Sequence, residues 1–151
     1  MTLGVAERIH PIVAAKLTEA TFLVLPDDMG VLVPDALHVL ASHLAEYNAL
    51  LVGPGLGTEP ITGELVYALL GASRRTRRMV GFAVGEQESR SALNLPPLVI
   101  DADALNLLAK QPNWWEYLPT GCILTPHPGE MSRLAKRETA DIQADRIGAA
   151  R

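Results

Sequence analysis

Leu51–Thr58 reads LVGPGLGT, and this stretch decides the fold. An apolar run, Ala49–Gly53, leads into it, and its three glycines let the backbone turn sharply and approach a ligand closely. After Pro60, apolar residues recur every four positions across Ile61–Leu69, which is the spacing of one helix face. The stretch therefore predicts a strand, a glycine loop and a helix in direct succession, which is the repeating unit of a parallel α/β fold.

Similar units occur along the whole chain. The compact apolar runs, each bounded by Gly, Pro or Asp, are Thr2–Val5, Thr21–Leu25, Ala49–Gly53, Pro97–Asp101 and Gly121–Thr125. These runs barely alternate between apolar and polar residues, which is typical of strands buried on both faces of a parallel sheet. The amphipathic stretches that follow them are Ile9–Leu17, Asp35–Leu44, Ile61–Leu69, Ala104–Lys110, Pro128–Leu134 and Thr139–Ile142.

The order of these elements predicts a three-layer α/β fold, with a mainly parallel sheet and helices on both of its faces. We expect residues 1–151 to form a single domain. One connection, residues 73–95, is long for a link between a helix and a strand. It holds five arginines, and we expect it to be an Arg-rich surface insertion.

Composition narrows the possible classes of protein. The chain has 151 residues, 48% of them apolar and 20% charged, which suits one domain with a sizeable core. Its net charge of −4 argues against nucleic acid or an anionic membrane as a partner. A single cysteine, Cys122, excludes a disulfide framework. The sequence shows neither a signal-peptide pattern nor an apolar run of membrane-spanning length, so we expect a cytoplasmic protein.

Parallel sheets bind their ligands beyond the carboxyl ends of the strands, so the residues that follow each strand are the candidate site. Three strand ends carry unusual residues: Gly53–Thr58, Asp101–Asn106 and Thr125–Glu130. The coincidence of these three segments at one type of position indicates a shared ligand site.

The glycine loop, Gly53–Thr58, allows two interpretations. Free backbone N–H groups and a helix N-terminus favour an anion such as phosphate. The loop could equally be a tight turn that needs glycine for its geometry alone. It is neither a dinucleotide fingerprint, whose third glycine comes later, nor a P-loop, because the lysine is missing.

Two carboxylates follow the fourth strand. Asp101 and Asp103 lie two residues apart and could organise a metal ion or a phosphate-bound water. Asp103 is also well placed to be the N-cap of the next helix, which is the stronger interpretation of that residue. Asp101, at the end of the apolar run, is the better candidate for a role in catalysis.

A histidine and a glutamate follow the fifth strand. Pro126 and Pro128 hold His127 rigidly at the tip of the strand, where its ring could hydrogen-bond a ligand or serve the loop structurally. Glu130 lies in the first turn of the next helix. It could approach a magnesium-bound water, or it could simply be favourable to the helix dipole.

Taken together and in this order, the three segments resemble the ADP/ATP-dependent NAD(P)H-hydrate dehydratases, a family earlier grouped with carbohydrate kinases and sharing the ribokinase-like fold. The matching stretches are Leu51–Thr58 (LVGPGLGT), Val99–Leu107 (VIDADALNL) and Ile123–Leu134 (ILTPHPGEMSRL). The resemblance implies a repair reaction, in which hydrated NADH or NADPH (NADHX or NADPHX) is dehydrated at the expense of ADP or ATP.

The resemblance also implies roles for particular residues. Gly55, Gly57 and His127 would contact the hydrated dinucleotide. Glu130 would help to organise Mg²⁺ through water, with Asp101 as a supporting carboxylate, and both are weak catalytic candidates. The partners would be the hydrated dinucleotide and an adenine nucleotide, and family members commonly form homo-oligomers.

One departure from the family stands out. The family's Gly-Gly-Thr-Gly-Asp segment, whose aspartate is the general base, does not occur in the 151 residues. We therefore expect a partial ribokinase-like fold that holds part of the substrate site and is inactive alone. Two alternatives stay open: a small-molecule kinase that acts on a sugar or vitamin hydroxyl, and a non-catalytic module for nucleotide binding or assembly.

Overall fold

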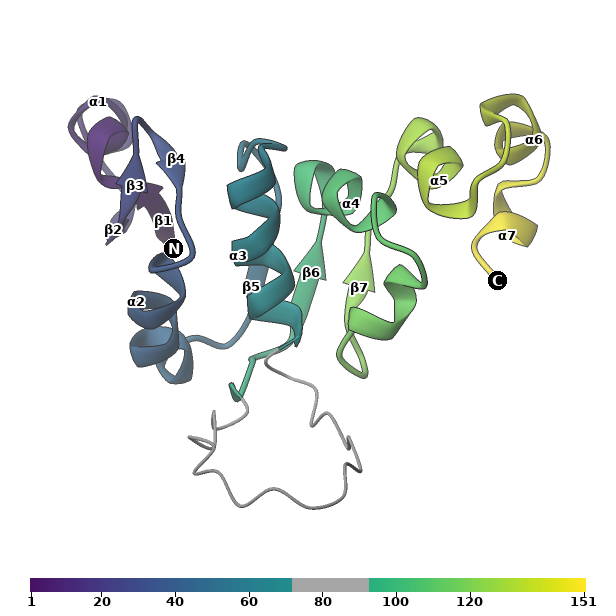
Figure 1. Ribbon diagram of the computed structural model, residues 1–151. Helices are drawn as coiled ribbons and strands as arrows, with labels where there is room; N and C mark the ends of the chain where they lie inside the picture. The colour runs from purple at the N-terminus through teal and green to yellow at the C-terminus, as the bar shows by residue number, and fades with distance from the viewer. Residues whose placement is uncertain (72–92) are drawn as a thin grey trace, which may run out of the picture.

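The computed structural model describes residues 1–71 and 93–151. The Arg-rich segment expected at 73–95 lies almost entirely outside the described residues. The described chain is α/β, and its elements run in sequence order from the N-terminal ladder at one end to the C-terminal helices at the other (Figure 1).

The N-terminal part is one parallel strand pair with its crossover. Strand β1 (Thr2–Ala6) pairs with β2 (Thr21–Leu25) in register Thr2↔Thr21 through Ala6↔Leu25. The crossover consists of a 3-10 turn, η1 (Glu7–Ile9), and a short helix, α1 (His10–Ala14). Pro11 stands in the first turn of α1, where its missing N–H costs nothing.

A small antiparallel hairpin follows, which the sequence analysis did not predict. Strand β3 (Asp27–Asp28) pairs with β4 (Val31–Leu32) around Met29 and Gly30, both of which have positive φ. The Asp27 carboxylate accepts hydrogen bonds from the backbone N–H groups of Arg8 and Gly30, at 2.8 and 2.7 Å. Both bonds lower the pKa of Asp27, and the bond from Arg8 fastens the hairpin to η1.

The remaining elements build the second parallel ladder and its helices. In chain order they are α2 (Ala36–His43), η2 (Leu44–Glu46), β5 (Leu50–Val52), α3 (Pro60–Gly71), β6 (Leu98–Ile100), α4 (Ala102–Ala109), η3 (Trp114–Tyr117), β7 (Ile123–Leu124), α5 (Pro128–Ala135), α6 (Thr139–Ala144) and α7 (Arg146–Ala149). The strands pair in the order β5–β6–β7, all parallel. Helices α3 and α4 lie on the same side of this ladder (Figure 1).

Two details differ from the sequence-based expectations. We expected one parallel sheet, but the parallel strands described form two separate ladders, β1–β2 and β5–β6–β7. We also expected strands buried on both faces, and this is wrong at alternate positions. Val24, Leu51 and Ile123 are 39%, 59% and 59% exposed. A continuous apolar run hides the period of two that separates the faces of a strand, so the exposed face could not be recognised from sequence.

The core lies where helices α3 and α4 pack on the strands. Its fully buried side chains include Val66 and Leu70 of α3, Ile100 of β6 and Leu108 of α4. A second cluster joins β1, β2, the hairpin and α2 to Leu65 of α3. Helix α3 therefore contributes to both clusters and connects the two ladders through its buried side chains.

Replacing Leu108 with alanine is expected to lower the free energy of unfolding by about 2–5 kcal/mol, because a fully buried leucine leaves a cavity when it is truncated. Leu51→Ala is the matched control. Its side chain is 59% exposed, so the loss should stay below about 1 kcal/mol. Urea unfolding of both variants provides the measurement, and equal losses would contradict this assignment of the core.

Candidate functional site

Strand register brings the three candidate segments to one edge of the sheet. Val52 pairs with Ile100, and Ile100 pairs with Leu124. The next residue on each strand is therefore Gly53, Asp101 or Thr125. The ladder continues one step further through Asp101, whose N–H donates to Val52 O at 3.0 Å, and through Thr125, whose N–H donates to Ile100 O at 3.2 Å. The glycine loop, the aspartate segment and the histidine segment thus begin side by side.

Gly53 is the point of closest approach between these segments. A Cβ atom at this position would overlap the carbonyl oxygen of Asp101 and lie 3.1 Å from the Cβ of Ala104. Gly53 also has φ +133°, which side chains rarely tolerate. Glycine is therefore required here for packing as well as for the turn, so the tight-turn interpretation holds at Gly53.

Beyond Gly53, the loop keeps its shape through positive φ angles and two contacts with α4. Gly55 and Gly57 have φ of +71° and +84°. The N–H of Gly57 donates to Asp103 Oδ2 at 2.9 Å, and Lys110 Nζ donates to the carbonyl of Thr58 at 2.9 Å. A Cβ on Gly55 would meet nothing within 4 Å, so the loop is open to a ligand there.

The aspartate segment differs from the expectation in one respect. Helix α4 begins at Ala102, so Asp101 occupies the N-cap position, and its side chain makes no capping hydrogen bond. Asp103 is therefore not the N-cap; its carboxylate serves the glycine loop instead. Ala102 has φ +49°, a left-handed conformation that is uncommon for alanine and marks strain where the strand meets the helix.

Sequence reasoning missed the roles of Asp103 and Lys110. Both side chains contact the glycine loop, one through Gly57 and the other through Thr58. The signal was their spacing of seven residues, which is two helical turns and places both on one side of α4. The sequence suggested mainly an N-cap role for Asp103 and gave Lys110 no role.

The histidine segment forms a closed set of hydrogen bonds at the start of α5. His127 is the N-cap, and its Nδ1 accepts from the N–H of Gly129 at 3.0 Å. Glu130 Oε2 accepts from the backbone N–H of His127 at 2.9 Å, and Glu130 Oε1 lies 3.2 Å from His127 Nε2. The His127 side chain is 64% exposed, whereas that of Glu130 is 7% exposed. The ring is therefore accessible to a ligand, whereas the carboxylate is buried against its own segment.

The resemblance implies Mg²⁺, which requires several oxygen ligands in one place. Within residues 1–71 and 93–151, no group of three or more His, Cys, Asp or Glu side chains could hold a metal ion. Both oxygens of the Glu130 carboxylate already have partners in its own segment, and the residue is buried. The described residues therefore offer no site for direct coordination of Mg²⁺ at Glu130, and the expected contact through a water molecule stays a prediction.

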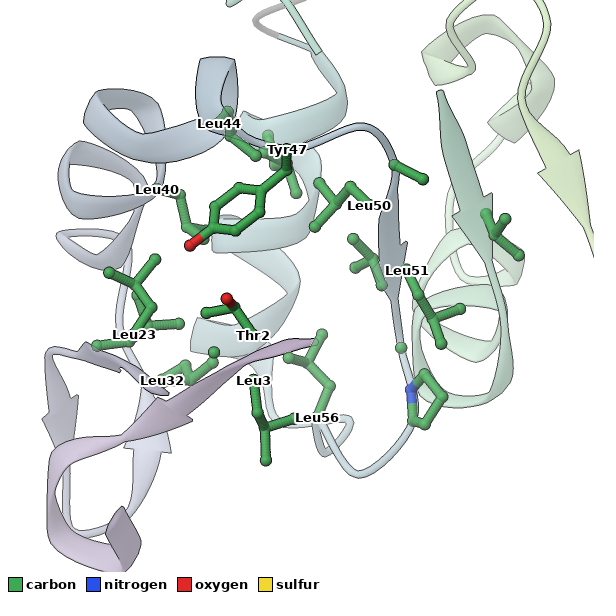
Figure 2. Close-up of a pocket in the computed structure, with 18 of the residues that line it drawn as sticks. Thr2, Leu3, Leu23, Leu32, Leu40, Leu44, Tyr47, Leu50, Leu51 and Leu56 are labelled. Atoms are coloured by element: carbon green, nitrogen blue, oxygen red, sulfur yellow. The ribbon is translucent and has the colours of Figure 1, made fainter. Parts of the chain in front are cut away.

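A cavity of about 510 Å³ lies apart from His127 and the two aspartates, between β1 and β5. Figure 2 shows its lining, in which leucine is the most frequent residue: Leu3, Leu23, Leu40, Leu44, Leu50 and Leu56 are among the labelled residues. It reaches the candidate site only at the start of the glycine loop. A cavity with so few polar groups lacks the means to orient a polar ligand, so we assign it to the gap between the two ladders.

Comparison with known protein families identifies the family of this chain. The sequence model of the family described as NAD(P)H-hydrate dehydratase matches residues 14–151, which include all three segments of the candidate site. The chain belongs to the NAD(P)H-hydrate dehydratase family. This finding confirms the resemblance inferred from the three motifs.

Curated relatives support the assignment of the chain to the NAD(P)H-hydrate dehydratase family. A bifunctional NAD(P)H-hydrate repair enzyme of Moorella thermoacetica is 38% identical over 97% of the chain. An ATP-dependent (S)-NAD(P)H-hydrate dehydratase of Ajellomyces capsulatus is 33% identical over 90%, and an ADP-dependent one of Neisseria meningitidis is 37% identical over 78%. The chain spans 24%, 32% and 35% of the lengths of these three relatives.

A solved structure supports the fold assignment. A ribokinase-like superfamily protein of Enterococcus faecalis superposes with a TM-score of 0.61 at 16% identity, over 99% of this chain and 41% of that one. The dehydratase family member therefore has a ribokinase-like α/β fold, of which this chain forms a part. No helix among its described residues has the length and apolar character needed to span a membrane.

Substituting alanine for Gly53 is expected to cost about 3 kcal/mol or more of unfolding free energy, because the new Cβ meets the backbone of Asp101 and the φ angle is unfavourable. Gly55→Ala serves as the control, since its Cβ would point into open space. Only the left-handed φ should then cost energy, about 1 kcal/mol. Urea midpoints that fall equally in the two variants would refute the close approach at Gly53.

The contact between Asp103 and Gly57 is tested by amide hydrogen exchange. Asp103→Ala removes the acceptor, so exchange at the Gly57 N–H should accelerate by about ten-fold. Asp103→Asn retains an oxygen acceptor of the same reach and should change the rate by less than about two-fold. The assignment fails if the alanine variant exchanges at the wild-type rate.

Proposed function

We propose that the protein carrying this chain performs the nucleotide-dependent dehydration of hydrated NADH and NADPH. The observation that carries this proposal is the single sheet edge at which the glycine loop, Asp101 and His127 meet, within a chain that belongs to the NAD(P)H-hydrate dehydratase family. The names of the relatives supply the substrate and the dependence on ADP or ATP.

The proposed chemistry is a phosphoryl transfer followed by an elimination. The hydroxyl group of the hydrated nicotinamide ring takes the terminal phosphoryl group of ADP or ATP. The phosphate then leaves with the oxygen, and a proton leaves the ring as the double bond reforms. The net reaction converts hydrated dinucleotide and ATP into reduced dinucleotide, ADP and phosphate, with AMP as the product when ADP is used.

The residues of this chain would bind and orient the hydrated dinucleotide. Gly55 leaves open space for the ligand, and the backbone of Gly57 is held in place by Asp103. His127 presents an exposed ring next to this loop, and Asp101 closes the edge between them. Fixing the loop before the ligand arrives lowers the entropic cost of binding.

The rest of the reaction would depend on residues outside this chain. The relatives are three to four times longer, and the family's Gly-Gly-Thr-Gly-Asp segment is not among the 151 residues. We propose that phosphoryl transfer uses that segment, so the 151-residue chain alone binds without turnover. Homo-oligomer formation, a cytoplasmic location and a single domain over residues 1–151 stay predictions.

The test is turnover of NADHX and NADPHX with ADP or ATP, followed by the return of reduced-nicotinamide absorbance. A protein of the relatives' length that carries this chain should restore NADH, and His127→Ala should raise KM by about 3- to 10-fold through loss of one ligand contact. Ribose and pyridoxal provide the control substrates. Phosphorylation of either one without repair of NADHX would favour the kinase alternative, and unchanged kinetics in the His127 variant would exclude its proposed role.

A further inference from the structure

We infer that Glu130 is a positioning residue for His127 and not a metal ligand. The Glu130 carboxylate holds the His127 ring in the tautomer that carries its proton on Nε2, so that the ring presents a hydrogen-bond donor to an acceptor oxygen of the ligand. The tautomer and its support follow from the geometry alone. The contact with the hydrated dinucleotide rests on the proposed function.

The tautomer follows from the hydrogen bonds of the ring. The backbone N–H of Gly129 donates to His127 Nδ1 at 3.0 Å, so Nδ1 uses its lone pair and carries no proton. A neutral imidazole then has its proton on Nε2. That nitrogen lies 3.2 Å from Glu130 Oε1, so the negative charge of the carboxylate favours a proton on Nε2 and stabilises this tautomer.

The Glu130 carboxylate is directed at its own segment and is buried, which leaves no room for a directly bound, hydrated cation. Oε2 accepts the backbone N–H of His127 at 2.9 Å, and Oε1 faces Nε2 of the same residue. The Glu130 residue is only 5% exposed. Mg²⁺ requires near-octahedral oxygen ligands and usually keeps several waters, which a carboxylate buried against its own segment cannot accommodate.

The hydrogen-bonding groups of the exposed His127 ring determine which ligand atom can bind there. The lone pair of His127 Nδ1 is engaged by the Gly129 N–H, so in this arrangement Nδ1 is not available as a metal ligand. The Nε2–H can donate a hydrogen bond to an oxygen of the ligand. The subsite therefore takes an acceptor oxygen of the hydrated dinucleotide, such as a phosphate, hydroxyl or carboxamide oxygen.

Nitrogen-15 NMR of the His127 ring tests the tautomer on the 151-residue chain without any ligand. The wild-type ring should show a protonated Nε2 and an unprotonated Nδ1. In Glu130→Gln, the negative charge beside Nε2 is lost and an NH₂ donor can face that nitrogen, so the Nε2–H population should fall. Glu138→Gln, an exposed carboxylate at the start of α6, is the charge-matched control and should leave the ring unchanged.

Three results of this experiment would overturn the inference: a wild-type ring protonated on Nδ1, a wild-type mixture of both tautomers, or a Glu130→Gln spectrum identical to wild type. Titration with MgCl₂ alone gives a second readout. The His127 and Glu130 signals should not shift with Mg²⁺, and a saturable shift confined to these two residues would restore the metal role.

A variant of His127 separates the ring from the helix cap. Asparagine is a good N-cap, so His127→Asn should keep the thermal midpoint close to wild type while removing the ring donor. In a protein of the relatives' length, both His127→Asn and Glu130→Gln should raise KM for NADHX by about 3- to 10-fold, with kcat changed less than KM. Equal losses of kcat and kcat/KM would contradict a positioning role. Absence of turnover in the unmutated protein would instead reject the proposed function and leave the NMR result standing.

Discussion

The close approach of Gly53 to the carbonyl oxygen of Asp101 is the constraint on which the candidate site depends. No side chain fits between the end of β5 and the beginning of α4, so the two strand ends touch through backbone alone. Because the strands are in register, that contact also fixes where the glycine loop begins relative to the histidine segment after β7. Strain at Ala102 lies at the same junction, which indicates that the surrounding packing imposes the geometry.

From this contact outward, two carboxylates of the site bind neighbouring parts of the chain. Asp103 holds the backbone of Gly57, and Glu130 holds both the backbone and the ring of His127. The carboxylates of Asp103 and Glu130, which the sequence offers as candidate metal-organising or catalytic groups, therefore accept hydrogen bonds from the protein backbone. The groups left accessible to a ligand are the glycine loop near Gly55 and the His127 ring, and both suit a ligand rich in oxygen acceptors.

The order of elements and the three segments at the sheet edge could be predicted from the sequence, because short apolar runs, glycine turns and prolines are local signals. The split into two ladders could not be predicted from the sequence. Pairing between strands that are distant in sequence depends on which strand packs beside each sheet edge in the folded chain. The hairpin around Gly30 was missed because its strands have only two residues each. Asp103 was predicted to cap its own helix. Its carboxylate instead accepts a hydrogen bond from the N–H of Gly57, a residue 46 positions away in the sequence. Glu130 and His127 were identified, but the hydrogen bond from the His127 N–H to the Glu130 carboxylate forms only once α5 is folded.

The most direct test of the central claim is amide chemical-shift mapping of the 151-residue chain during titration with NADHX. The account predicts shifts concentrated at Gly53–Thr58, Asp101–Asn106 and Thr125–Glu130, the three segments that meet at the carboxyl edge of β5, β6 and β7. Shifts confined to the leucine-lined cavity between β1 and β5, with none at that edge, would contradict it.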